Sequence, residues 1–462
     1  MNLASNMQVV GLPPAELEKF NTLLGIYAAH LGKNREKDRY YEGKISLQEV
    51  NLGIALPKTF RDLQIGCAWG AKTVDVLAAR SMFDGFVNAS GEQSDELTDI
   101  VLSNNLIAEY GKACRDELKY GCTFVTLSGD DKIGCKIRFH SPQTAAAHWN
   151  GELGRIDYGF AVIDSKPARM SEDSEPILVN FYTDDAIWTL SKVQDVWRAE
   201  YHPHRMGRPL MEAFVWNATS SKPFGRSRIK EPIRRLIQGY VRTIANATIG
   251  LEFSTAPQKY LLGVTDDQYD AIINQKFRQY IGSIIASTTN PETGEKPTFG
   301  QLQQGSIAPH VEMMRLLATQ FSAATGLTVM DTGVVNDANP TSSDAILAQT
   351  QTLVSMAEQL NHGNGDALRT VALMALAIKG NTTTEALADE QKNIIAHFKN
   401  PAMPSVAVTA DAAIKIASAR EGFAGTDTFL EMIGFDQADI RRIRAQERMN
   451  RGLQVVTELE AE

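Results

Sequence analysis

The sequence lacks the features by which membrane and secreted proteins usually reveal themselves. Its 462 residues contain no apolar run that approaches the roughly 20 residues needed to span a bilayer. The start, MNLASNMQVVGLPPAEL, has no basic segment followed by an apolar one, so we expect no secretory signal. These absences predict a protein that does not act in a membrane.

Cysteine is scarce. The four cysteines form no CxxC pair, which gives little support to a zinc site or to thiol–disulfide exchange. We therefore expect free, buried thiols in a reducing compartment. The cysteines are Cys67, Cys114, Cys122 and Cys135.

The common catalytic motifs are also missing. The chain has no GxxxxGK(S/T), GxSxG, HExxH or GxGxxG, so nothing indicates a phosphate cradle, a nucleophile elbow or a zinc protease. Paired acids beside turn formers are usually solvated caps, and a histidine pair without a third ligand is a weak metal signal. The sequence predicts no catalytic residue, cofactor or metal. The candidates weighed were His202-Pro203-His204, Asp130-Asp131, Asp184-Asp185, His140 and His148, of which the last two are expected to be packed.

Positive charge is in the minority. With 46 lysines and arginines against 55 acidic residues, the formal net charge is −9. Proteins that grip nucleic acid usually present a basic surface, because much of their affinity comes from neutralising phosphates. If this chain meets DNA, we expect it to hold the DNA weakly.

Hydrophobic periodicity indicates a helical start, a β-rich middle and a helical second half. A chain of this length should divide into roughly two to four domains. A polar loop at 328–344 separates two of the helices, and the long helix after it is expected to break near Gly363-Asn364-Gly365 and to end at Gly380. Helices are predicted over 15–31, 67–86, 95–119, 229–255, 307–324, 343–379 and 439–462, and strands of a mostly antiparallel sheet over 122–216.

Six ordered segments resemble the portal proteins of tailed double-stranded-DNA phages, in the family typified by portals of long-tailed phages. Each segment is weak alone, but their order and spacing follow the family over most of the chain, and the part past about 410 is the least specific. The segments are RYYEGK (39–44), WGAKTVDVLAARSMFDGF (69–86), NNLIAEYGKACRDELKYGCTFVTL (104–127), FGRSRI…I…A (224–247), FGQLQQGSIAPHVEMMRLLATQFSAATGL (299–327) and NPTSSDAILAQ (339–349).

The resemblance implies an α+β portal fold with a β-rich wing, long stem helices, a small α/β clip and a helical crown. The implied divisions are wing 1–228, stem helix 229–255, clip 256–306, stem helix 307–327, channel loop 328–344, wing helix and extension 345–400, and crown 401–462.

By the same resemblance, the chain is a structural protein rather than an enzyme. The family forms a homododecameric ring at one capsid vertex, through which DNA is packaged and ejected. The implied partners are other copies of the chain, the terminase large subunit, the major capsid and scaffolding proteins, the head–tail adaptor and the passing double-stranded DNA, with no membrane. The implied location is the virion, and the host cytoplasm during assembly.

The implied sites fall into three groups. The loop contains acids and amides but no lysine or arginine, so we expect it to touch DNA sterically or by hydrogen bonds rather than by ion pairs. The loop residues are Val329, Asp331, Asn336, Asp337 and Asn339. The stem residues that could face the channel or a neighbouring copy are Arg234, Arg235, Arg242 and Arg315. The clip residues that could dock terminase or the connector are Asn290, Pro291, Glu292, Lys296 and Phe299.

Two other interpretations stay open. The chain could be an enzyme acting on nucleic acid or a small molecule, with its site hidden in the β-rich domain. It could also be a different virion component, such as a head–tail adaptor, although its length and its helix–loop–helix pair disfavour that interpretation.

Overall fold

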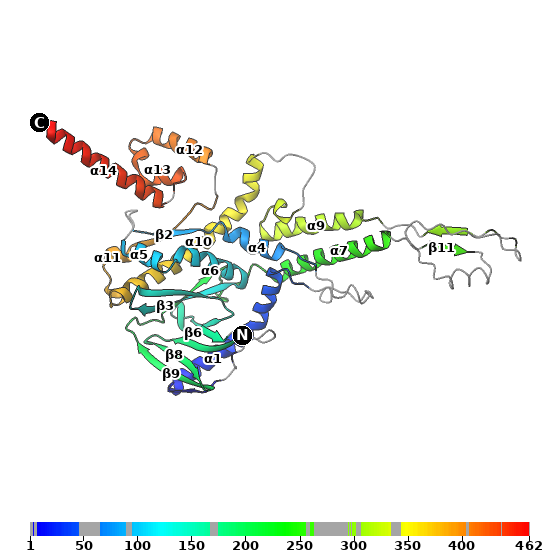
Figure 1. The fold of residues 1–462 in the computed structure, drawn as a ribbon, viewed down its shortest axis with the longest axis horizontal. Coiled ribbons are helices and arrows are strands. Elements are labelled where there is room, and N and C mark those ends of the chain that lie inside the picture. Colours follow the sequence, from blue (N-terminus) through cyan, green and yellow to red (C-terminus); the bar gives the residue numbers. More distant parts are fainter. Residues whose placement is uncertain are drawn as a thin grey trace.

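The computed structural model combines a mixed α/β body with two long helices that project from it (Figure 1). The C-terminal helices form a separate group on the opposite side of the body from the tip of this projection. The structure describes residues 3, 7–45, 65–88, 95–166, 174–255, 259–262, 294, 296, 298–301, 306–333, 343–402, 406–435 and 437–461.

Two sheets build the β-rich part, as the alternating sequence between 122 and 216 predicts. Their pairings are antiparallel except for the short β1, which lies parallel to β9. The six-stranded sheet has the order β1(Val9–Val10), β9(Val196–Pro203), β8(Ala186–Val193), β7(Glu175–Tyr182), β6(Arg155–Lys166), β5(Ala145–Asn150), and the three-stranded sheet has the order β10(Met211–Val215), β3(Cys122–Asp130), β4(Gly134–His140).

The first helix covers one face of the six-stranded sheet. Helix α1 (Pro14–Tyr41) runs ten residues beyond the predicted 15–31, because its later turns also bury side chains, among them Tyr40. Phe20 packs edge-on against Phe160 and Phe181 of the sheet, with ring centroids 5.8 and 5.5 Å away. This contact fixes the N-terminal helix to the β-rich part.

Two predicted helices proved shorter than expected. The segment 67–86 is helical only as α4 (Trp69–Ala78) and continues as strand β2 (Phe83–Asn88). The strand pairs with β13 (Ile394–Phe398), some 300 residues later, and a partner so distant in sequence gives no local signal.

The segment 95–119 is broken into α5 (Asp95–Ser103) and α6 (Leu106–Tyr120). Asn105 adopts a left-handed conformation at the break, with φ 49°. The Asn104 side chain donates to the carbonyls of Ile100 and Cys135 and accepts from the Ile137 amide. These bonds to β4 offset the lost helical bonds.

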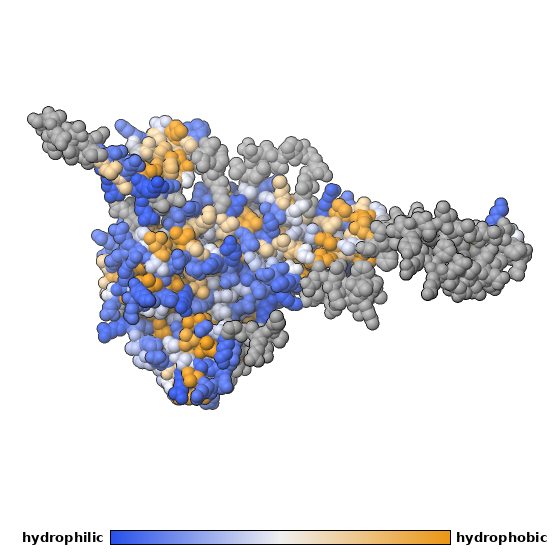
Figure 2. Space-filling model, viewed as in Figure 1, coloured by the Kyte–Doolittle hydropathy of each residue, from blue (hydrophilic) through white to orange (hydrophobic). Residues whose placement is uncertain are grey.

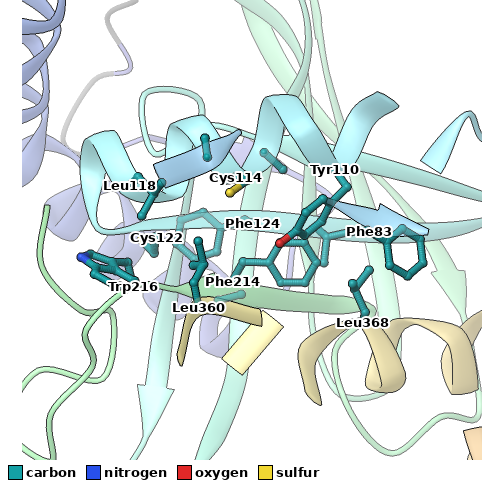
Figure 3. Close-up of a cluster of buried hydrophobic side chains, with 14 of the residues drawn as sticks. Phe83, Tyr110, Cys114, Leu118, Cys122, Phe124, Phe214, Trp216, Leu360 and Leu368 are labelled. Atoms are coloured by element: carbon teal, nitrogen blue, oxygen red, sulfur yellow. The ribbon is translucent and has the colours of Figure 1, made fainter. Parts of the chain in front are cut away.

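The main core lies between α6, the three-stranded sheet and the long helix α10 (Ser343–Lys379). Figure 3 shows side chains from all three elements converging there. Aromatic rings meet edge-on, as Tyr110 and Phe214 do at 6.0 Å. All four cysteines are buried and free, which confirms the expected buried thiols.

The predicted interruption of the long helix at Gly363-Asn364-Gly365 is wrong, because α10 is continuous over 37 residues. Asn364 is fully buried and directs its side-chain amide to the Tyr110 hydroxyl at 3.0 Å and to Glu117 Oε2 at 2.7 Å. The turn-forming side chain therefore bonds to helix α6 instead of competing with its own backbone. As predicted, the helix ends just before Gly380.

The C-terminal part is helical. Helices α12 (Val406–Ala419), α13 (Asp427–Met432) and α14 (Gln437–Ala461) follow β13. Arg444 joins the last helix to α13 through Asp427, 2.6 Å away.

Candidate functional site

The projection consists of two helices packed side by side (Figure 1). They are α7 (Glu231–Thr255) and α9 (Ala308–Thr325), which agree within two residues with the predicted 229–255 and 307–324. Gly239 allows their close approach, because a Cβ built there would lie 3.3 Å from Leu317 Cδ2. The buried side chains of the pair include Ile233, Ile237, Val241, Leu317 and Phe321.

One tryptophan holds both helices to the body. Trp69, the first residue of α4, stacks between Tyr240 of α7 and Phe321 of α9, with ring centroids 4.1 and 4.5 Å away. Its indole Nε1 also donates to the carbonyl oxygen of Thr332, 3.1 Å away. A single side chain thus joins both projecting helices and the start of the loop that follows them.

The segment PFGRSRI (223–229) sets the direction in which α7 leaves the body. Gly225 has φ +65°, and a Cβ there would lie 2.2 Å from the carbonyl oxygen of Trp216, so only glycine fits this turn. Two residues later, the Ser227 hydroxyl donates to the Lys119 carbonyl and accepts from the Ile229 amide. The entry to α7 is therefore fixed against the end of α6.

Arg228 lies at the centre of this junction. It is 7% exposed, and its guanidinium donates to the Thr73 carbonyl at 2.6 Å and to the Thr325 carbonyl at 2.7 Å. Burial lowers the pKa of Arg228 to about 10, so the side chain remains charged at neutral pH. A buried cation needs hydrogen-bond partners to offset its lost hydration, and here these bonds link α4 to the end of α9. Arg228 and Trp69 both lie in segments that carry the family resemblance, but the sequence predicted no role for either residue.

The predicted stem arginines differ in their surroundings. Arg234 is only 16% exposed and pairs within the same copy with Glu231 and with Glu36, the latter at 3.5 Å. Arg235 is 71% exposed and also bonds to Glu231, at 2.8 Å. Arg234 therefore ties α7 to α1, whereas Arg235 faces solvent.

Arg242 and Arg315 have no ion-pair partner among the residues that the structure describes. Arg315 is exposed on α9 and Arg242 is partly exposed on α7. Figure 2 shows hydrophobic residues gathered over the two projecting helices. Among the side chains of the two helices that the structure describes, the large exposed apolar ones are Leu251, Val311, Met313 and Leu316.

The loop begins as a tight turn. Residues Met330–Thr332 form a 3-10 turn, in which Asp331 Oδ2 accepts from the Thr328 amide at 2.9 Å and from its hydroxyl at 2.8 Å. Val329 is partly buried at the start of this turn. The other predicted loop residues, Asn336, Asp337 and Asn339, lie outside the described residues.

The far end of the projection carries a two-stranded sheet. Strand β11 (Lys259–Leu262) pairs with β12 (Thr298–Gln301), which places Phe299 opposite Leu261 in the register. Lys296 is exposed just before β12. Asn290, Pro291 and Glu292 lie outside the described residues.

Three of the candidates for chemistry are packed or capping groups. His140 is buried beside Thr126, 2.9 Å away, and burial lowers its pKa to about 4. Asp130 accepts from the amides of Lys132 and Ile133 and so caps a turn. His148 stacks on Tyr158 and bonds to Asp157. Within the described ranges, no cluster of three or more histidine, cysteine or acidic side chains could hold a metal ion.

The comparison with known families decides the identity. Residues 21–452 match the model of the family described as phage portal protein, SPP1 Gp6-like. The chain belongs to this portal protein family. The match covers the β-rich part, the projecting helices and most of the C-terminal helices, and it confirms the resemblance found in the sequence. Family membership fits a structural role in the virion.

A relative and two solved structures add to this result. The portal protein of Mycobacterium phage D29 is 23% identical over 428 residues, which are 89% of this chain and 84% of the relative. "Virion of native gene transfer agent (GTA) particle" has a chain with TM-score 0.44 and 12% identity, covering 79% of this chain and 89% of that one. "Neck of native GTA particle computed with C12 symmetry" gives TM-score 0.45 and 11% identity over the same shares.

The portal-family chain is an α+β protein in structure, as the sequence predicted. In the part of it that the structure describes, no helix combines the length and the apolar character of a bilayer-spanning segment. The division into wing, stem, clip and crown stays a prediction, although the helix and strand boundaries given above are compatible with it.

Proposed function

We propose that twelve copies of this portal-family chain form a ring whose channel passes DNA into and out of the capsid. The observation that carries the proposal is the pair α7 and α9, whose apolar side chains remain exposed in a single copy. Identical subunits in a ring use two different faces of each copy, and two inclined helices supply both faces. Contact with the neighbouring copy in the ring would bury the exposed side chains of Leu251, Val311, Met313 and Leu316.

The remaining parts have roles that follow from this arrangement. The residues after Thr332 would approach the channel axis, with Arg242 and Arg315 facing either the DNA or the next copy. The β11–β12 end would dock the terminase motor during packaging and the head–tail connector afterwards. Capsid and scaffolding proteins would surround the ring, which would assemble in the host cytoplasm without catalytic activity of its own.

The test is assembly. The full-length chain should elute and image as a ring near twelve times 50.8 kDa. Leu316→Glu should leave the fold intact but prevent ring formation, because an exposed charge at a subunit contact is costly to bury. Leu153→Glu, at a similarly exposed leucine in a turn of the sheet, is the matched control and should assemble normally. Rings of normal size from Leu316→Glu would contradict the proposed packing of the stem.

Docking at the tip has its own test. Deletion of 288–298 should impair either subunit association or motor docking. If the deletion variant forms rings and packages DNA at the normal rate, this end of the projection does not dock the motor.

A further inference from the structure

A basic cavity lies beside the first turn of α7 and the segment that leads into it. The cavity has a volume of about 760 Å³ and is bounded by α1, by β3 and β5, and by the segment that leads into α7. Six of its lining side chains are lysine or arginine and one is glutamate, in a chain whose net charge is −9. The lining of the cavity is therefore positively charged, although the chain as a whole is negatively charged.

Two of the six cations are already engaged. Lys37 donates to the Tyr120 carbonyl at 2.8 Å and to Asn34 Oδ1 at 3.3 Å, and burial lowers its pKa. Arg234 is paired with Glu231 and Glu36. These two cations shape the inner wall rather than the rim.

The other four cations stand at the rim without acidic partners in the described part of the chain. All four are exposed, and like charges gathered around one opening repel one another unless an anion is present. They are Lys33, Lys222, Arg226 and Lys230.

The floor of the cavity is apolar. It is lined by Ile26, Pro142 and the alanines 145–147, with Phe224 on one side. Phe224 is held in place by edge-on contacts with Phe124 at 5.7 Å and Trp149 at 5.9 Å. A floor of this kind favours an apolar side chain, for which a bare phosphate or a DNA duplex has no equivalent.

We propose that this cavity docks an acidic peptide segment of a partner protein, with one apolar side chain on the floor and carboxylates at the rim. Charge complementarity selects the acidic partner, and the apolar floor selects a peptide over nucleic acid. Lys222 and Lys230 would hold the carboxylates, beside the entry to α7. Because the same segment aims α7, an occupied cavity would also stiffen the root of the stem.

The experiment uses the full-length chain and the fluorescein-labelled peptide Glu-Asp-Phe-Glu-Leu-Asp-Glu. Fluorescence anisotropy should report saturable binding that weakens with salt. The variant Lys222→Glu/Lys230→Glu should weaken binding at least about tenfold. The control Lys132→Glu/Arg205→Glu changes two equally exposed cations elsewhere and should leave the affinity unchanged. If the reversal variant misfolds, Lys222→Gln/Lys230→Gln gives the same comparison.

Three outcomes would overturn the proposal. The first is equal binding by the cavity variant and the control variant. The second is competition by a short DNA duplex or inorganic phosphate but not by the unlabelled peptide, which would make the cavity a phosphate site. The third is loss of peptide binding on ring formation, which would make the cavity an interface between copies. A peptide with alanine in place of phenylalanine and leucine should bind more weakly, because the floor then loses its occupant.

Discussion

Arg228 donates to the carbonyl oxygen of Thr325 across 2.7 Å, and so joins the segment that leads into the first projecting helix to the last residue of the second. A hinge motion of these helices relative to the body would have to break this hydrogen bond. The same guanidinium holds Thr73 of α4. The junction is therefore locked at the point where the two helices leave the body.

We expect Arg228→Met to lower the free energy of unfolding by roughly 2–4 kcal/mol, because it leaves two buried carbonyls unsatisfied. The stability of Arg228→Lys should lie between those of Arg228→Met and the native chain, because one ammonium group cannot reproduce both hydrogen bonds of the planar guanidinium. Urea denaturation of the unassembled chain measures both. The control Arg226→Met changes an exposed arginine two residues away and should shift stability by less than about 0.5 kcal/mol. Equal effects at 226 and 228 would contradict the assigned role.

Trp69→Ala should destabilise the attachment of the stem by roughly 3–5 kcal/mol, because it empties the space between Tyr240 and Phe321. Trp69→Phe keeps an aromatic ring but cannot donate to Thr332, and should cost about 1 kcal/mol. Thermal unfolding measures the stability, and limited proteolysis near residue 330 reports the release of the turn. Native-like resistance to proteolysis in Trp69→Ala would argue against the clamp.

The pH dependence of stability should contain a contribution from Glu117. Complete burial raises the pKa of this carboxyl from 4.5 to about 8, and the bond from Asn364 opposes the shift only in part. A raised carboxyl pKa means that the folded state holds its proton more tightly, so this contribution is complete below about pH 4.5 and declines as pH rises toward 8.

The slope from this one group is at most about 1.4 kcal/mol per pH unit. Glu117→Gln should remove the decline and be more stable than the native chain at pH 8, while it still accepts the Asn364 bond. Melting temperatures between pH 5 and 8 provide the test. Parallel curves for the two proteins would mean that Glu117 keeps an ordinary pKa.

Charge reversal in the loop should slow DNA without affecting assembly. Asp331→Lys and Asp337→Lys add cations beside the proposed channel, and phosphate contacts repeated around a ring increase retention. Asp331→Asn is the control for the turn, since it keeps an oxygen that can accept from Thr328. The measurement is the rate at which DNA becomes nuclease-resistant in a packaging reaction. Unchanged rates in rings carrying the lysines would contradict DNA contact at the loop.

Local patterns in the sequence predicted the elements that carry the proposed channel. The apolar periodicity of α7 and α9 gave both helices within two residues, and the alternation between 122 and 216 gave the antiparallel strands. These signals are local, because a helix or strand face repeats every few residues.

Long-range partners could not be predicted in the same way. Strand β2 exists because β13 pairs with it from a distant part of the chain. The continuity of α10 depends on the hydrogen bond from Asn364 to Glu117 on α6. Trp69 looked like one residue of a family segment, but its role appears only when Tyr240, Phe321 and Thr332 surround it. Tertiary contacts of this kind override local preference.

The uncovered leucine and methionine side chains on the outer half of α9 have a thermal consequence. Whatever covers them must release ordered water, and this driving force weakens in the cold. Association through this surface should therefore strengthen between ice temperature and the warmth of a growing culture, and chilled preparations should shift toward separate copies.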